Sequence, residues 1–407
     1  MLERRRKVNR WVILAVLFFA RTAMAFQFQS VASVSPLMVR DLALDLALFG
    51  TLVGAWMLPG VAVAIPGGLL GKRFGDKRVT LFGLLLMVVG SALTAMSSEY
   101  GVALAGRVVS GAGAVLLNVL LAKMVADWFS DRELATAMGI LVVSWPVGIG
   151  LALALLGPLS AASSWSFALW IAAWVCLAAL VLVALMYRDP PAQLTSPLQA
   201  QASRLTRPEL TLASLAGGVW TLYNVSFIIV VSFAPLLLAG RGLPAADAAL
   251  VASAATWPLI ASIPLGGVVA DKTGRGELIM IVCFVAMAAC IPLSLVAPSP
   301  LAMLAVTGLV MGPAAGVIMS LPARALRPEA RNLGMGIYYT WYYVGMALLP
   351  GVAGWTREIT GTPFAPFGFA GLLMICAIVC LYAFKHLEGT EGRRGADRAA
   401  SGPRHGG

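Results

Sequence analysis

The chain is a series of apolar runs, each long enough to cross a lipid bilayer as a helix. A spanning helix needs about 20 mostly apolar residues, and such runs between charged or Pro/Gly breaks number twelve. The predicted spans are 11–39, 47–70, 79–97, 101–126, 134–157, 164–187, 209–239, 246–270, 278–297, 301–323, 333–356 and 364–385. Only 12% of the residues are charged, about half the fraction found in soluble domains. The sequence therefore predicts an all-α polytopic membrane protein with twelve transmembrane helices.

The positions of the basic residues predict how these spans are oriented. If the basic segment 4–10 is cytoplasmic, every second loop is cytoplasmic as well, and all but five of the 29 lysines and arginines lie on or next to that side. The exceptions are Arg21, Arg40, Arg107, Arg241 and Arg357. The positive-inside rule then places both termini in the cytoplasm, which indicates the inner membrane. It also explains the net charge of +11 without a nucleic-acid partner.

An internal repeat divides the chain into two halves. Shifted by 199 positions, residues 21–75 align with residues 220–274 without a gap. The matched pairs include Thr22/Thr221, Pro36/Pro235, Pro59/Pro258, Gly67/Gly266, Gly68/Gly267 and Gly75/Gly274. Further on, Gly148 matches Gly345 at an offset of 197. Parallel repeats of this kind place a substrate near the middle of the membrane, between the two halves.

The repeat and one long polar connection define the domain boundaries. We predict an N-terminal six-helix bundle (1–187), a cytoplasmic central loop (188–208), a C-terminal six-helix bundle (209–386) and a disordered cytoplasmic tail (387–407). One alternative concerns residues 4–25, which also fit a signal peptide with a basic start and an apolar run. Cleavage there would leave eleven spans, and the second half would lose its repeat partner.

Related motifs follow the second and eighth spans. Residues 68–78 are GLLGKRFGDKR, and residues 267–275 are GVVADKTGR. Both resemble the G-x-x-x-D-[RK]-x-G-[RK] loop of the major facilitator superfamily, and Arg107-x-x-x-Gly111-x-Gly113 resembles that family's R-x-x-x-G-x-G helix. The resemblance implies two pseudo-symmetric six-helix bundles and transport by alternating access. It also implies a conformational switch made of Gly68, Lys72, Arg73, Gly75, Asp76, Gly267, Asp271, Lys272, Gly274 and Arg275.

The first copy of the loop departs from the family pattern, because Lys72 occupies the acidic position and Asp76 follows Gly75. A second resemblance concerns residues 127–139, which are similar to the 4–5 region of nitrate/nitrite and cyanate-type porters. It implies the small-anion branch of the superfamily. Nitrate porters, however, carry substrate arginines in spans two and eight, and neither span here contains one.

Arg21 and Arg107 place permanent positive charge inside apolar spans, with no carboxylate at comparable depth in the sequence. A charge at mid-membrane costs about 2.5–3.5 kcal/mol on insertion scales, so it normally faces a bundle interior or a wet cavity. A guanidinium group offers a rigid fork of donors that binds carboxylates in a bidentate manner. The pair therefore indicates an anionic solute.

Helical spacing and the repeat add neighbours to these arginines. The predicted substrate-binding residues are Arg21, Phe28, Arg107, Asn118, Trp220, Asn224, Tyr338 and Tyr342. Each has a structural alternative: the arginines can bond to helix carbonyls or snorkel, and tyrosines can form an interfacial belt. In an α-helix, Tyr338 and Tyr342 share one face, and Tyr339 and Tyr343 share another. At most one of these pairs can therefore point fully into a cavity.

The sequence lacks the residues that enzymatic chemistry would need. It has no Ser/His/Asp set, metal-ligand cluster or nucleotide loop, and both histidines lie at or beyond the last span. We therefore expect no enzyme activity, cofactor or metal site. Proton symport usually needs a buried titrating group, so exchange or facilitated transport of a small anion by a monomer is predicted. The alternative is an efflux pump for amphipathic neutral or anionic compounds.

Overall fold

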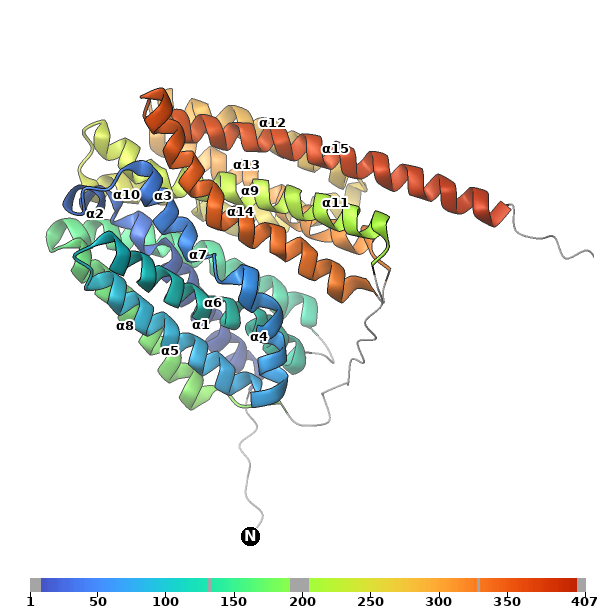
Figure 1. Ribbon diagram of the computed structural model, residues 1–407, viewed down its shortest axis with the longest axis horizontal. Coiled ribbons are helices and arrows are strands. Elements are labelled where there is room, and N and C mark those ends of the chain that lie inside the picture. The colour runs from blue at the N-terminus through green and yellow to red at the C-terminus, as the bar shows by residue number, and fades with distance from the viewer. Residues whose placement is uncertain (1–8, 130–132, 191–204, 328–329, 401–407) are drawn as a thin grey trace, which may run out of the picture.

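The computed structural model describes residues 9–129, 133–190, 205–327 and 330–400, and they form two adjacent helical bundles (Figure 1). The first half contains α1 (Arg10–Ser33), α2 (Ser35–Asp41), α3 (Leu46–Ala55), α4 (Gly60–Phe74), α5 (Asp76–Ala95), α6 (Tyr100–Phe129), α7 (Leu134–Ala162) and α8 (Trp165–Met186). The second half contains α9 (Arg207–Gly240), α10 (Ala245–Ser253), α11 (Trp257–Thr273), α12 (Gly276–Val296), α13 (Pro300–Ala325), α14 (Arg331–Thr360) and α15 (Ala365–Ala400). The predicted all-α fold is confirmed.

Eleven segments among the described residues are long and apolar enough to cross a membrane. The remaining predicted span, 333–356, is α14, whose sequence is less apolar because its first half carries the tyrosine cluster 338–343. We call the side that carries Arg10 and the α4–α5 and α11–α12 turns the terminal side. The side that carries the α9–α10 and α14–α15 turns is the distal side.

The second and eighth spans are broken helices, which corrects the prediction of single helices over 47–70 and 246–270. Residues 56–59 separate α3 from α4, and residues 254–256 separate α10 from α11. A proline lies at each break, Pro59 and Pro258, and proline removes one backbone hydrogen bond and collides with the preceding turn. The two breaks lie at equivalent positions of the repeat.

The repeat is also visible in the packing between helices. A Cβ atom added to Gly148 on α7 would lie 2.4 Å from the carbonyl oxygen of Thr22 on α1. In the second half, a Cβ added to Gly345 on α14 would lie 2.1 Å from Cγ2 of Thr221 on α9. Each glycine therefore lets its helix approach the partner helix closely, and both contacts use residues that the repeat had paired.

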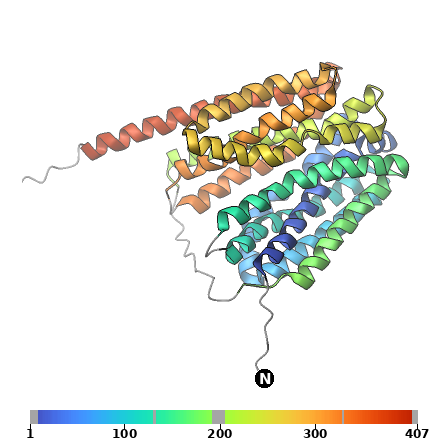
Figure 2. The ribbon, with the colours of Figure 1, turned by 180° about the vertical axis from the view of Figure 1, so that it is seen from behind.

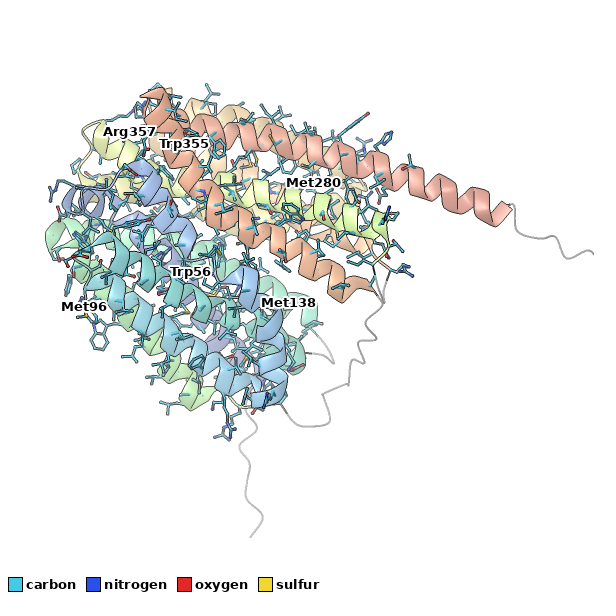
Figure 3. The ribbon with its side chains drawn as sticks, viewed as in Figure 1. Trp56, Met96, Met138, Met280, Trp355 and Arg357 are labelled. Atoms are coloured by element: carbon cyan, nitrogen blue, oxygen red, sulfur yellow. The ribbon has the colours of Figure 1, made fainter. Side chains whose placement is uncertain are left out.

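The two halves meet closely on the distal side. Cβ atoms added to Gly50 and Gly54 on α3 would lie 2.0 and 2.2 Å from the carbonyl oxygens of Pro350 and Ala347 on α14. A carboxylate oxygen of Glu358 also accepts a hydrogen bond from the Ala47 backbone at 3.1 Å. Figure 3 places Trp355 and Arg357 at this end of α14. Direct backbone contact thus closes the distal side.

On the terminal side, ion pairs tie helices together within each half. Lys123 on α6 contacts Asp76 at the start of α5. In the second half, Arg324 on α13 lies 3.0 Å from Glu277 on α12 and 2.6 Å from Glu388 on α15. These pairs stabilise each bundle as a unit.

The segment after the last span differs from the prediction of a disordered tail over 387–407. Helix α15 continues to Ala400 and projects beyond the bundle (Figures 1 and 2). Glu, Arg and Ala, which favour helices, recur in this segment, and Arg324 holds its first turn through Glu388. Residues 401–407 lie outside the described residues, as do residues 191–204 of the predicted central loop.

Candidate functional site

Arg21 lies in the middle of α1 and is partly buried between the halves. Its Nη1 donates to the carbonyl oxygen of Leu141 on α7 at 2.8 Å, and the same oxygen accepts a bond from the Ser144 hydroxyl at 2.5 Å. No carboxylate among the described residues forms an ion pair with this guanidinium group. Because one oxygen occupies only Nη1, the other donors of Arg21 are available to a ligand.

Arg107 on α6 has a different environment, because it is 2% exposed and bonded to the backbone. Its donors reach the carbonyl oxygens of Gln27 and Phe28 on α1 at 3.2 and 3.0 Å. They also reach those of Leu52 and Val53 on α3, at 3.1 and 3.3 Å. The carbonyls at the end of a helix have no partner within that helix. Arg107 therefore braces the end of α3 against α1, as its structural alternative predicted.

Three rings of the first half form what we call the first aromatic cluster: Phe28 on α1, Trp56 at the α3–α4 break and Trp145 on α7. The ring centroids of Phe28 lie 5.0 Å from Trp56 and 5.6 Å from Trp145. The Trp56 indole N–H donates to Oε1 of Gln27 at 2.8 Å, and Figure 3 shows Trp56 inside the first bundle. The cluster is thus held in place by a buried polar side chain.

Six rings of α9 and α14 form the second aromatic cluster: Trp220, Tyr223, Tyr338, Tyr339, Tyr342 and Tyr343. Trp220 is central to it, with ring centroids 5.8 Å from Tyr223 and 6.3 Å from Tyr342. Tyr339, Tyr342 and Tyr343 are near enough to interact electrostatically with Arg21. The second cluster therefore borders the Arg21 guanidinium from the opposite half of the molecule.

The structure changes which tyrosines belong beside Arg21. Tyr338 is 0% exposed, and its hydroxyl lies 3.5 Å from the sulfur of Met319 on α13, so it packs inside the second bundle. Tyr339 and Tyr343 were not among the predicted binding residues, but they interact with Arg21 together with Tyr342. The helical period shows which residues share a face of α14. Packing against neighbouring helices determines which face is directed toward the first half.

The two predicted asparagines have different surroundings. Asn118 on α6 lies beside the Tyr343 hydroxyl of the opposite half. Asn224 donates to the carbonyl oxygen of Trp220 in its own helix at 2.8 Å. Of the two, Asn118 joins the halves beside Arg21, whereas Asn224 stabilises the turn that carries Trp220.

The loop-motif glycines have the backbone conformation that their position requires. Gly75 has φ 88° and Gly274 has φ 64°, values that favour glycine, and their N–H groups cap α4 and α11 at 2.9 Å. Asp76 contacts Lys123 within the same half. Arg73, Asp271, Lys272 and Arg275 are exposed. Gly267 lies in α11, and Gly68 and Lys72 lie in α4, where the structure describes only their backbone.

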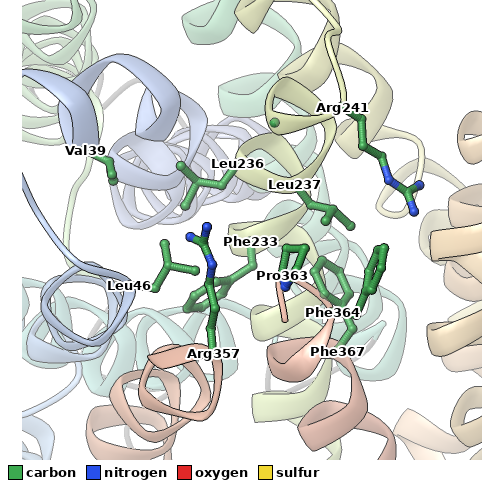
Figure 4. A pocket seen from close by; sticks show the side chains of 11 residues that line it. Val39, Leu46, Phe233, Leu236, Leu237, Arg241, Arg357, Pro363, Phe364 and Phe367 are labelled. Carbon is green, nitrogen blue, oxygen red and sulfur yellow. The ribbon is translucent and has the colours of Figure 1, made fainter. Parts of the chain in front are cut away.

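A cavity of about 260 Å³ lies on the distal side, away from Arg21, between the α2–α3 region and α9, α14 and α15 (Figure 4). Leu46, Phe233 and Phe367 line it together with Arg241 and Arg357. Both arginines are exposed, and the Arg241 guanidinium already lies 5.0 Å from the ring centroid of Phe364. Water weakens interactions of exposed charges, so we place the candidate site at Arg21.

The sequence analysis did not identify Gln27 or the Leu141 carbonyl. Gln27 was detectable as one of two glutamines in a mainly apolar span. A backbone carbonyl leaves no signal in the sequence. The described residues contain no group of three or more His, Cys, Asp or Glu placed to hold a metal ion.

Comparison with known proteins places the chain among transporters. Residues 17–228 and 215–404 each match the Major Facilitator Superfamily. The 3-(3-hydroxy-phenyl)propionate transporter of Escherichia coli K12 is 26% identical over 268 residues, covering 63% of this chain and 64% of the relative. An MFS-type transporter of Aspergillus terreus is 28% identical over 164 residues, covering 40% of this chain and 30% of the relative. The chain thus spans less than two thirds of these curated relatives.

A solved structure shares the fold. The xylose transporter of E. coli in its inward-open conformation superposes with a TM-score of 0.74 at 12% sequence identity, covering 92% of this chain and 96% of that chain.

Proposed function

The chain belongs to the major facilitator superfamily. On this premise, we propose that it is a secondary transporter in a membrane and that its substrate is a small anion bound at Arg21. One observation carries the proposal. Arg21 is a permanent charge between the two halves, only one of its donors reaches a backbone oxygen, and no carboxylate among the described residues pairs with it.

The electrostatics of this position favour an anion. A cation away from bulk water is costly unless an opposite charge or hydrogen bonds compensate it. Arg107 obtains that compensation from four carbonyl oxygens, whereas Arg21 obtains it from one. A bound carboxylate or similar oxyanion would supply the missing acceptors at Arg21 in a bidentate arrangement.

The arrangement of the two halves supports alternating access around this site. Arg21 and Leu141 belong to the first half, and the tyrosines that interact with Arg21 belong to the second. Rocking of one bundle against the other, the motion usual for such repeats, would therefore change the environment of the ligand. The loop-motif residues at the ends of α4 and α11 are proposed to stabilise the alternative conformation, in which the distal side opens.

We further propose that transport proceeds by exchange or facilitated movement. The groups that interact electrostatically with Arg21 are tyrosines, which stay neutral near pH 7. Closing the protein around an unoccupied guanidinium would be costly, and a bound anion would relieve that cost. The proposal also places both termini in the cytoplasm, in a monomer of the inner membrane, because most basic residues lie on the terminal side.

Among anions, an organic one has the better support. The E. coli relative is named for 3-(3-hydroxy-phenyl)propionate, an organic acid. The resemblance to nitrate and cyanate porters rests on the 127–139 segment alone. The candidate site is also bordered by aromatic rings, which suit a ligand with an apolar body.

The test is counterflow of labelled anions in proteoliposomes, with nitrate, nitrite, cyanate, formate, oxalate and larger carboxylates as a panel. Arg21→Gln is expected to reduce transport of the preferred anion about tenfold to a hundredfold, because hydrogen bonds to charged groups contribute about 1.5–3 kcal/mol. Arg40→Gln is the matched control, since Arg40 has a 72% exposed side chain and pairs with its neighbour Asp41.

Unchanged transport by Arg21→Gln would remove this residue from the site and contradict the proposal. Transport of neutral amphipathic compounds that is insensitive to Arg21→Gln would instead support the alternative, an efflux pump. Uptake driven by an imposed pH gradient without a counter-anion would contradict exchange.

A further inference from the structure

We propose that the Arg21 site selects anions that carry a planar aromatic ring, with the carboxylate on Arg21 and the ring between the first and second aromatic clusters. The inference rests on the proposed function, because it assumes that Arg21 binds the substrate. It goes further by assigning the aromatic residues a role in specificity.

Both clusters contribute a ring near Arg21. Phe28 and Trp56 of the first cluster lie beside Arg107, with ring centroids 5.8 and 6.0 Å from its guanidinium carbon. Trp145 lies one turn after Leu141, whose carbonyl oxygen holds the Arg21 guanidinium. In the second half, Tyr342 interacts electrostatically with Arg21 and lies 6.3 Å from the Trp220 ring. A ligand bound to Arg21 therefore has aromatic side chains of both halves as neighbours.

The second cluster also reaches the break in the second span, which carries Trp56. A Cβ atom added to Gly60, the first residue of α4, would lie 2.1 Å from Cδ1 of Tyr343. Gly60 follows the break that carries Trp56, a member of the first cluster. The rings of the two halves thus approach the same segment, and the absence of a side chain at Gly60 makes this approach possible.

The second cluster has one buried donor without a partner among the described residues. The Trp220 indole N–H is buried and makes no hydrogen bond with the described residues. The other buried tryptophan of the site, Trp56, donates to Gln27. A buried donor without an acceptor is unusual in native structures. A carboxylate or ring hydroxyl of a bound ligand would supply the acceptor for Trp220.

These features together favour an aromatic acid over other anions. Aromatic rings interact favourably in stacked or edge-to-face arrangements with centroids about 4.5–7 Å apart. An inorganic anion would satisfy Arg21 but would make no aromatic contact with Trp145 or Trp220, whose side chains are half-buried. A saturated ring acid has the same charge and similar volume, but it lacks the flat face and polarised edge that such contacts use.

The experiment compares benzoate with cyclohexanecarboxylate, two acids with equal charge and carbon number, as competitors of labelled benzoate binding to the purified full-length protein. We expect benzoate to bind about tenfold more tightly than cyclohexanecarboxylate, because one or two aromatic contacts contribute about that much to affinity. Trp220→Leu and, separately, Trp145→Leu should reduce this preference to less than about threefold. Trp220→Phe, which keeps a ring, should retain the preference. Trp355→Leu is the matched control, because Trp355 is 54% exposed.

The outcomes separate this inference from the proposed function. Equal binding of the two acids, with both lost in Arg21→Gln, would overturn the aromatic preference and leave the anion site intact. An unchanged preference in both leucine variants, each confirmed as folded by its unfolding temperature, would also overturn it. Binding of benzoate that survives Arg21→Gln would contradict the proposed function itself.

Discussion

The second and eighth spans are broken at equivalent positions, yet the two breaks are stabilised in different ways. In the first half, Arg107 on α6 donates to the carbonyls of Leu52 and Val53 at the end of α3. Gly111 and Gly308, which are 197 positions apart, make equivalent contacts with the two breaks. The same shift of 197 positions makes Leu304 the equivalent of Arg107 in the second half. Leu304 is apolar and 3% exposed.

The second break obtains its donors locally. The Ser253 hydroxyl bonds to the Leu250 carbonyl oxygen at 2.6 Å, and the Thr256 hydroxyl bonds to that of Ser253 at 2.7 Å. Gly54 and Met57, the equivalents in the first half, have no hydroxyl group. A broken membrane helix thus requires donors for its carbonyls, but these need not be charged. Because Arg107 is engaged in this bracing, the proposed anion site depends on Arg21.

The largest effect is expected from Arg107→Leu, which copies the residue of the second half into the first. The carbonyl oxygens of Leu52 and Val53 at the end of α3 would lose their donor, and each buried unsatisfied group costs about 1–3 kcal/mol. We expect the free energy of unfolding in detergent to fall by about 3 kcal/mol or more. Leu304→Met is the control and should change it by less than about 1.5 kcal/mol. Wild-type stability of Arg107→Leu would show that the break does not need this brace.

A smaller effect is expected from glycine substitutions at the two breaks. A Cβ at Gly111 would lie 1.9 Å from the Trp56 carbonyl oxygen, and one at Gly308 would lie 2.1 Å from that of Ala255. Overpacking costs about 1–3 kcal/mol. Gly111→Ala should be the more destabilising, because the Trp56 side chain is fixed by Gln27 and cannot easily shift. Gly101→Ala, with no atom within 4 Å of its Cβ, is the control on the same helix.

Thermal unfolding of the two alanine variants would test this order. Equal or reversed losses would mean that the first break is no more rigid than the second.

Removing the hydroxyl groups of the second break should have a modest effect. Ser253→Ala and Thr256→Val are each expected to cost about 1 kcal/mol, the usual net value of one hydrogen bond. The two costs should be nearly additive, because the Thr256 hydroxyl bonds to the backbone carbonyl oxygen of Ser253, which Ser253→Ala keeps. A double-mutant cycle measured by chemical unfolding checks both points. A coupling energy above about 0.5 kcal/mol would contradict two independent hydrogen bonds.

The smallest effect is expected from Trp257→Phe. The indole N–H of Trp257 donates to the Ser253 hydroxyl at 3.2 Å, but the side chain is 39% exposed, so water can replace part of the interaction. We expect a loss of about 0.5 kcal/mol and unchanged transport. A loss as large as that of Arg107→Leu would mean that the second break also depends on one dominant side chain.

Much of the architecture follows from local features of the sequence. Apolar runs predicted the helical spans, because a backbone inside lipid must satisfy its hydrogen bonds within the helix. The repeat predicted that Thr22 and Thr221, or Gly148 and Gly345, occupy equivalent positions, and their packing confirms it. The repeat also placed Pro59 and Pro258 in register, although the breaks beside them were not predicted.

The site was predictable only in part. The sequence identified Arg21 and Arg107 as intramembrane cations, because such charges stand out in an apolar run. It could not show that Arg107 is bonded to four carbonyl oxygens while Arg21 is bonded to one. Those acceptors belong to other helices, and their availability depends on where the second span breaks.

The sequence by itself therefore determined the membrane class, the two-fold repeat and the presence of buried positive charge. The tertiary structure alone decided which arginine keeps free donors and which tyrosines of α14 lie beside it. The physical reason is that helix formation and membrane insertion depend on neighbours within a few turns. The environment of a buried side chain depends instead on groups that helix packing brings together from more than a hundred residues away, as Arg21 and Leu141 show.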